Sequence, residues 1–232
     1  MRKNDNKREV EFKRQTGPFF KFVQMVLCPL FPIRKVPDEA SMPRPAVYLC
    51  RHADNSGPLY TLLNLKGNFR PWIYYVFCDE KICFEHTYGY TFTERGGKPK
   101  PIAWILARLS AFSAPKVVRS MRSIPVYRNS AKSMSTIRES IQALLNGESL
   151  LIFPDVNYTQ ADGDVGEIYR GFLILERMYM AKTGKHLEFV TMKMYPKDRI
   201  EIGNSVMFED GDYASQVETV AAKIEAELNR ME

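Results

Sequence analysis

His52 is the residue in this sequence best placed for acid–base chemistry. It follows the apolar run Ala46–Cys50, and a polar, turn-forming segment separates it from a second apolar run at residues 59–63. This pattern predicts a buried strand, a tight turn and the start of a helix. Ligands of α/β proteins usually bind at the carboxyl ends of strands. An imidazole there can act as a general base, because its unperturbed pKa of about 6.5 lies near neutral pH.

Arg128 is the best candidate for binding a phosphate, because it closes a short β-prone run at residues 123–128. Its permanently charged guanidinium can hold a phosphate through two hydrogen bonds, although exposed surface arginines are common. The surrounding stretch has almost no acidic residues, and its other cations are Arg95, Lys98, Lys100, Arg108, Lys116, Arg119, Arg122 and Lys132. Such a stretch suits a phosphorylated ligand or an anionic membrane surface. We expect no nucleic-acid partner, because no recognisable nucleic-acid module accompanies the charge.

Several familiar sites have no counterpart in the sequence. It has no glycine-rich nucleotide loop, no GxSxG motif and no paired-cysteine zinc spacing. Cys83 and His86 could share a helix face and a metal, but satisfied or exposed side chains are the commoner outcome. The loop at 162–167 lacks the spacing of an EF-hand, so a solvated turn is favoured there. We therefore expect neither a bound metal nor a bound cofactor.

The order of the predicted elements indicates a layered α/β domain with a largely parallel sheet flanked by helices. The expected strands are at 46–50, 71–79, 123–128, 150–154, 188–195 and 199–208, and the expected helices at 102–122, 133–146, 168–183 and 213–229. We expect Pro115 to break the first of these helices, and Ser133 to cap the second. One apolar stripe on the first helix comprises Ile102, Ile105, Leu109 and Phe112.

The first 45 residues differ from the remainder. We expect residues 1–45 to form a basic N-terminal segment with an apolar interfacial helix and a Pro-rich connector, and residues 46–232 to form the α/β domain. The apolar run at 19–31 is too short to cross a bilayer. Its aromatic bulk and flanking cations suit the surface of an anionic membrane. Packing on the core of the domain is the open alternative.

The overall composition is that of a folded protein of 232 residues, with a net charge of +6 and 45% hydrophobic residues. The four cysteines lie in or beside apolar runs and form no CxxC pair. The first apolar segment begins late and has no small-residue cleavage site. These features predict a cytoplasmic protein with reduced thiols, associated peripherally with the cytoplasmic membrane.

Three short motifs, taken in order, resemble those of the PlsC-like glycerolipid acyltransferases, the superfamily of lysophosphatidate and glycerol-3-phosphate acyltransferases. His52 matches the histidine of the family's H-x4-D motif, and the run ending at Arg128 resembles its arginine-ended motif. Residues 153–155 (FPD) are similar to its FPEG motif, and the strand at 189–195 falls where the family has a Val-Pro-rich strand. The resemblance covers residues 47–208, and the order and spacing are more specific than any single motif.

The sequence departs from the family pattern at two of these motifs. Gly57 occupies the position of the H-x4-D carboxylate, while Asp155 and Val156 replace the Glu and Gly of FPEG, with no arginine directly after them. A fold can persist without its site, so a non-catalytic acyl- or phospholipid-binding relative is the alternative reading.

The resemblance implies transfer of an acyl group from acyl-CoA or acyl-carrier protein to a hydroxyl of a glycerol-phosphate lipid such as lysophosphatidate. His52 would be the general base. Asp54, Asn55 or Asp155 would substitute for the missing carboxylate that orients the imidazole.

The same resemblance implies the substrate-binding residues. Arg128 would bind the phosphate of the acceptor, and Arg170 would add a second phosphate contact. Phe153 and Pro154 would shape the acceptor pocket.

Overall fold

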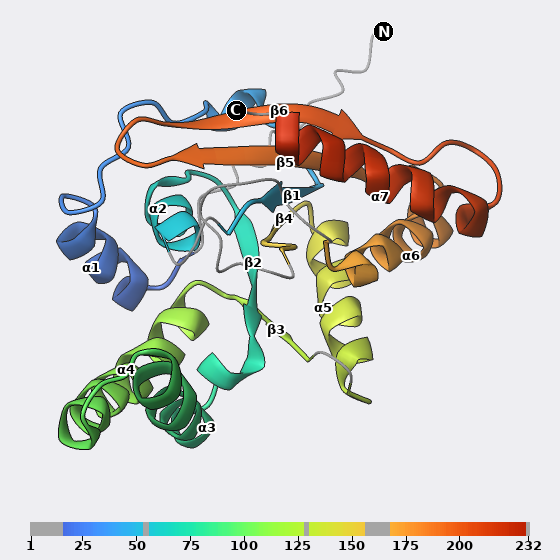
Figure 1. Ribbon diagram of the computed structural model, residues 1–232. Helices are drawn as coiled ribbons and strands as arrows, with labels where there is room; N and C mark the ends of the chain where they lie inside the picture. The colour runs from blue at the N-terminus through green and yellow to red at the C-terminus, as the bar shows by residue number, and fades with distance from the viewer. Residues whose placement is uncertain (1–15, 53–55, 128–129, 156–167, 231–232) are drawn as a thin grey trace, which may run out of the picture.

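The chain folds into a mixed α/β domain built on a six-stranded sheet with the order β3-β2-β4-β1-β5-β6 (Figure 1). The computed structural model describes residues 16–52, 56–127, 130–155 and 168–230. The strands are β1 (Ala46–Cys50), β2 (Phe69–Tyr74), β3 (Ile124–Val126), β4 (Ser149–Ile152), β5 (Glu188–Tyr195) and β6 (Arg199–Val206). Strands β1 to β5 are mutually parallel, and β6 pairs antiparallel with β5 at one edge. The predicted largely parallel sheet flanked by helices is confirmed.

Helices follow most of the strands along the chain. The α-helices are α1 (Pro18–Leu27), α2 (Ser56–Asn64), α3 (Glu80–His86), α4 (Lys100–Ser120), α5 (Ser133–Leu145), α6 (Ile174–Thr183) and α7 (Tyr213–Arg230). A π-helix, η3 (Thr87–Arg95), continues α3, and short 3₁₀ turns are η1 (Glu39–Ser41), η2 (Tyr75–Phe77) and η4 (Arg170–Leu173). The expected break at Pro115 is wrong, because α4 runs through this proline to Ser120. The expected cap is also wrong, since Ser133 is the first residue of α5 and Lys132 occupies the N-cap position.

Strand β1 is the central strand that carries His52 at its end. All five of its residues are fully buried. Val47 and Leu49 pack into the core shared with α5, α6 and α7, whereas Tyr48 and Cys50 pack with α2 on the opposite face. A parallel strand covered on both faces needs apolar side chains on both faces, which explains the uninterrupted apolar run. The backbone that leads into His52 is therefore firmly held.

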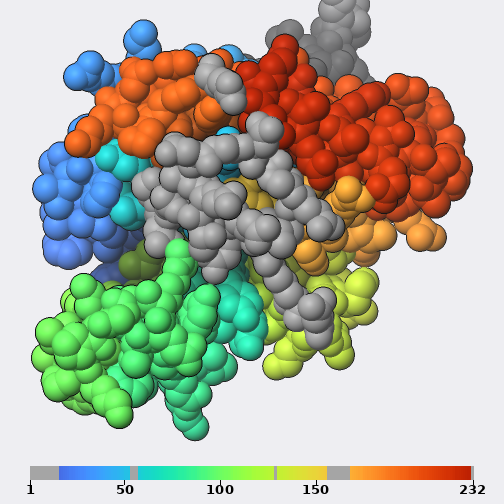
Figure 2. All heavy atoms as spheres, viewed as in Figure 1, coloured from blue at the N-terminus to red at the C-terminus, as the bar shows by residue number. Residues whose placement is uncertain are grey.

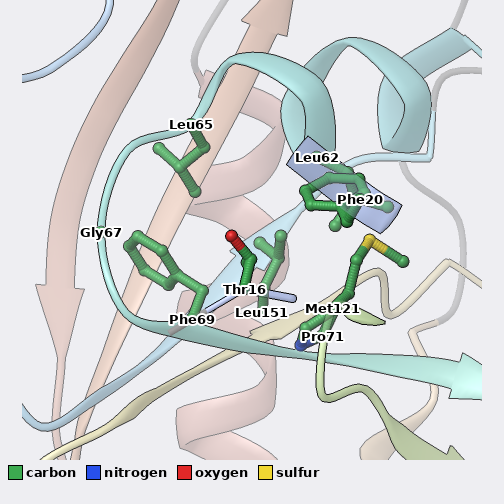
Figure 3. A pocket seen from close by; sticks show the side chains of 9 residues that line it. All are labelled: Thr16, Phe20, Leu62, Leu65, Gly67, Phe69, Pro71, Met121 and Leu151. Atoms are coloured by element: carbon green, nitrogen blue, oxygen red, sulfur yellow. The ribbon is translucent and has the colours of Figure 1, made fainter. Parts of the chain in front are cut away.

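The described part of the N-terminal segment is packed on the domain. Helix α1 lies beside α4, where the N–H of Gly17 donates to the carbonyl of Ser120 at 2.7 Å. Phe20 is buried with Leu63 and Met121 between these elements. Figure 3 shows the crevice at this junction, in which the side chains surround Thr16. Its volume of about 20 Å³ has room for about one water molecule, so it is not a substrate site.

Helix α4 buries the face opposite to its large apolar residues. The buried side chains are small or compact: Ala103, Ala107, Ala111, Pro115 and Val118. They let α4 pack closely against α3 and η3, and these helices form a lobe at one end of the molecule, drawn in green in Figure 2. The apolar stripe is left in solvent, with Ile105 60% and Leu109 63% exposed. Among the described helices, none is both long enough and apolar enough to span a bilayer.

Candidate functional site

A cavity of about 620 Å³ lies at the edge of the sheet where the carboxyl ends of β1, β2, β3 and β4 meet. From the strands and the turns that follow them, it is lined by His52, Trp72, Ile73, Tyr74, Phe77, Val126, Ile152, Phe153 and Asp155. The remaining lining residues are Pro58, His86, Tyr90, Thr91, Arg95 and Tyr169. Small-molecule sites typically have volumes of roughly 300–1,000 Å³, and this edge is where open α/β sheets bind ligands. The cavity is therefore the best candidate for a functional site.

Asp155 connects the end of β4 to the end of β1. Its Oδ2 accepts a short hydrogen bond from the backbone N–H of His52. The residue is only 9% exposed, and its Oδ1 is buried without a hydrogen-bond partner among the described residues. Burial raises the pKa of the Asp155 carboxyl above its ordinary value, against the lowering effects of this hydrogen bond and of the charges of His52 and Arg51. A buried carboxylate thus lies next to His52 and interacts electrostatically with it.

The structure explains why glycine stands at position 57. A Cβ atom placed on Gly57 would lie 2.3 Å from the carbonyl oxygen of His52 and 2.8 Å from that of Arg51. Both are backbone atoms at the end of β1, so they cannot rotate out of the way as a side chain could. Glycine lets the first turn of α2 lie directly against His52, and this conformation has no room for a carboxylate at position 57. The carboxylate beside His52 comes instead from the end of β4.

Phe153 limits the space around the imidazole of His52. The two rings meet edge to face, with their centroids 5.9 Å apart. Pro154 is buried behind them, and its carbonyl accepts a hydrogen bond from the N–H of Tyr169 at 2.8 Å. The structure therefore brings His52, Phe153 and Asp155 together in the cavity wall and places Pro154 as their support.

Of the other predicted site residues, the structure describes only Arg170. Asp54 and Arg128 lie outside the described residues, so their roles stay predictions. Arg170 lies on the far side of the turn that carries Tyr169, with its guanidinium 2.5 Å from Glu218 and 3.8 Å from Glu225 of α7. It does not line the cavity, so the structure does not bring it to the place where the expected phosphate contact would be made.

A second group of lining residues could not be anticipated from the motifs. His86, Tyr90 and Arg95 reach the cavity from the end of α3 and from η3. The ring of His86 has three aromatic neighbours, Tyr90 at 5.6 Å and Tyr74 and Phe77 at 6.1 Å between centroids. The only signal in the sequence was the aromatic character of the run from 84 to 92. Its aromatic residues fit both the i+4 spacing of a helix (Phe84, Tyr88, Phe92) and the alternation of a strand (Tyr88, Tyr90, Phe92), so the pattern favours neither.

The cavity thus combines a candidate base with an aromatic wall. His52 lies at the rigid end of β1, with a buried carboxylate beside it. Among the described residues that line the cavity, Asp155 is the only carboxylate. This arrangement can accept a proton from a bound hydroxyl in surroundings suited to an apolar or aromatic ligand.

No model of a known protein family matches this chain, and no curated protein matches its sequence. Among solved structures, the fold is similar to the crystal structure of the 1-acyl-sn-glycerophosphate (LPA) acyltransferase PlsC from Thermotoga maritima. The two share 12% identity and a TM-score of 0.49, over 92% of this chain and 78% of that one. This likeness concerns the overall fold alone.

Proposed function

We propose that the protein transfers an acyl group from an acyl-thioester to a hydroxyl of a glycerol-phosphate lipid such as lysophosphatidate. The observation that carries the proposal is the position of His52 at the ligand-binding edge of the sheet, bonded through its backbone to Asp155 of the FPEG-like turn. Two segments that resemble separate motifs of the acyltransferases, and that lie about one hundred residues apart, thus form one wall of one cavity.

In the proposed reaction, His52 acts as the general base. It takes the proton of the acceptor hydroxyl as the hydroxyl oxygen attacks the thioester carbonyl carbon. The tetrahedral intermediate then collapses, the carbon–sulfur bond breaks, and the leaving thiolate takes the proton from the imidazolium. General-base assistance of this kind contributes about 10²–10⁴-fold to the rate. The acyl donor would be acyl-CoA or acyl-carrier protein, acting as co-substrate rather than as a bound cofactor.

Asp155 would serve as a positioning residue. Its hydrogen bond to the backbone of His52 fixes the turn that presents the imidazole. The negative charge also favours the imidazolium that forms when the hydroxyl proton is taken. Asp54 remains an alternative partner for the imidazole, and Arg128 remains the proposed ligand of the acceptor phosphate on the strength of the motif resemblance.

The exposed apolar residues of α1 and α4 support a peripheral position on the anionic surface of the cytoplasmic membrane. Five large apolar residues of α4 and three of α1 are about half exposed or more: Ile102, Trp104, Ile105, Leu109, Phe112, Phe22, Met25 and Val26. Cations accompany them, and the Lys116 amine lies 3.1 Å from the centre of the Phe112 ring. Exposed apolar side chains flanked by lysine and arginine favour binding to anionic lipid surfaces. A lipid acceptor would then be available without passing through water.

The direct test is acyl transfer by the purified full chain. The protein is mixed with anionic vesicles that contain lysophosphatidate and with labelled acyl-CoA or acyl-carrier protein, and acceptors with other headgroups are tried in parallel. His52→Ala should lower kcat/KM by about 10²–10⁴-fold. His186→Gln is the matched control, because His186 contacts Glu176 and Asp210 away from the cavity. Absence of transfer from either donor to every acceptor would refute the proposal, as would full activity in a folded His52→Ala variant.

A second function is favoured by Gly57 alone. Without the H-x4-D carboxylate, the cavity could bind an acyl chain or a phospholipid without transferring it. Tight binding of acyl-CoA with no turnover in the same assay would support this binding function. Turnover that disappears in His52→Ala would exclude it.

A further inference from the structure

The π-helix η3 determines which residues of its segment face the cavity. Arg95 lies nine positions after His86 in the sequence, and both line the cavity. In an α-helix with 3.6 residues per turn, nine residues make two and a half turns and place the two side chains on opposite faces. In a π-helix, whose i→i+5 hydrogen bonds give about 4.4 residues per turn, they make about two turns and share one face. The π geometry is therefore what brings Arg95 to the same wall as His86.

The residues between them agree with this geometry. Tyr90 and Thr91 lie one π-turn from each end, and both line the cavity as well. The hydroxyl of Thr93 donates to the carbonyl of Tyr88, five residues back, at 2.6 Å. π-Helices are rare and are often found at functional sites, so a nine-residue example that aligns three cavity-lining residues with His86 just before it calls for a functional explanation.

We propose that His86 and Arg95 form a subsite for a phosphomonoester in the cavity that also holds His52. Arginine provides a charged, planar fork that matches two phosphate oxygens. His86 adds a nitrogen that can donate to a third, and the hydroxyl groups of Tyr90 and Thr91 are further donors on the same face. Arg95 is exposed, so the subsite lies where the cavity opens to solvent and a charged group enters without a large desolvation cost.

The distribution of charge along the cavity agrees with this assignment. The one carboxylate among its described lining residues, Asp155, lies with His52 at the strand ends, while Arg95 comes from the end of η3. Arg170, which the motif resemblance implied as a second phosphate contact, is held by two glutamates of α7. Among the described residues that line the cavity, Arg95 is the only lysine or arginine.

A phosphomonoester could reach this subsite from two sources. If the proposed function holds, they are the phosphate of the glycerolipid acceptor and the ribose phosphate of a CoA donor. Binding of an anion at His86 and Arg95 does not itself depend on catalysis. A binding experiment therefore separates the subsite from the reaction.

The test is calorimetric titration of the full chain with inorganic phosphate, glycerol 3-phosphate and CoA. Arg95→Ala should weaken the binding of whichever phosphomonoester uses the subsite by about 10- to 100-fold. Arg95→Lys, which keeps the charge but loses the fork, should weaken it by about 3- to 10-fold, and His86→Gln by a similar factor. Lys98→Ala is the matched control, because Lys98 is an exposed cation three residues away that does not line the cavity. Its affinity should equal that of the wild type.

Each outcome decides the proposal. An effect of Arg95→Ala on glycerol 3-phosphate but not on CoA assigns the subsite to the acceptor, and the reverse assigns it to the donor. Equal affinities of wild type and Arg95→Ala for all three ligands overturn the subsite, as does an equal loss in Lys98→Ala, which would indicate general electrostatic attraction. If Arg95 proves necessary for binding but no acyl transfer is found, the subsite stands and the proposed function fails.

Discussion

Placing the carboxylate of the H-x4-D motif at position 57 should damage this protein rather than improve it. The Cβ atom of any residue there would lie 2.3 Å from the carbonyl oxygen of His52, far inside van der Waals contact. The clash can be relieved only by moving the first turn of α2 or the end of β1. The second movement would also break the hydrogen bond from the His52 N–H to Asp155.

The two effects set the expected size of the loss. Overpacking costs about 1–3 kcal/mol, and a lost hydrogen bond to a charged acceptor costs about 1.5–3 kcal/mol. We expect Gly57→Asp to lower the free energy of unfolding by about 3 kcal/mol. In a chain of this size that corresponds to a fall in Tm of roughly 6–12 °C. Gly57→Ala should lose nearly as much, because the clash begins at Cβ.

Thermal unfolding followed by circular dichroism, together with kcat/KM for acyl transfer, measures both consequences. Gly89→Ala is the matched control, since a Cβ at this helical position meets nothing within 4 Å. That control should leave the Tm unchanged or raise it slightly. A Gly57→Asp variant with an unchanged Tm and a higher kcat/KM would contradict this expectation. It would show that the turn accommodates a side chain at position 57 and that a carboxylate there can orient the imidazole of His52.

Three further predictions follow from other contacts. Asp155→Asn should raise the Tm at pH 7 while lowering kcat/KM about 10- to 100-fold. Because burial raises the pKa of Asp155 above 3.8, the wild type should gain stability as the pH falls through that raised pKa. The Asp155→Asn variant should lack this gain. The hydrogen bond to Glu176 raises the pKa of His186 above 6.5, so the stabilising contribution of this bond should be complete below pH 6.5 and be lost as the pH rises through the raised pKa. His186→Gln should flatten the dependence of Tm on pH in that range. An unchanged slope of Tm against pH would contradict the assignment. The double variant Ile105→Glu, Leu109→Glu should abolish flotation with anionic vesicles without lowering the Tm, because both residues are more than half exposed. The control Met207→Glu, at an exposed position after β6, should float like the wild type. Flotation of the double variant as well as of this control would exclude α4 as the membrane-contacting helix.

Most of the sheet could be predicted because its strands have a clear apolar pattern. The exception is β2, since the strand expected at 71–79 ends at Tyr74, where η2 begins. β1 has the expected bounds, since an apolar run that is buried on both faces has no competing helical period. The last helix was equally clear, with Val220, Ile224 and Leu228 all buried on one face of α7. In both elements the local pattern and the tertiary packing require the same residues.

Helix α4 shows where the pattern is insufficient. Periodicity identified a helix and an apolar stripe, but periodicity does not say which face is buried. The face that packs is the one with alanines at 103, 107 and 111, because small side chains allow α3 and η3 to approach closely. Pro115 is tolerated within the helix at the end of that same buried face.

The candidate site was only half predictable, for a related reason. His52 and Asp155 follow apolar strands, and strand ends can be located from sequence. Their direct connection follows from the parallel pairing of β1 with β4, because the register that sets Leu49 opposite Ile152 also sets His52 opposite Asp155. The sequence does not say that these two strands are neighbours. His86 and Arg95 depend on a π-helix, whose period matches neither the 3.6 residues of an α-helix nor the alternation of a strand. Residues placed nine apart give no reason to expect a shared face.

The lobe of α3, η3 and α4 joins the two proposed interactions of the protein. One side of this lobe lines the cavity through His86 and Arg95, and an outward face of α4 carries the exposed apolar stripe. The two sides are connected by the close packing of α4 on α3 and η3. A lobe that rests on a bilayer by its stripe would hold the phosphate subsite at a fixed distance from the lipid headgroups, whereas His52 remains on the rigid sheet. Substitutions in the stripe should therefore raise the KM for a vesicle-bound acceptor and leave the KM for a water-soluble one unchanged.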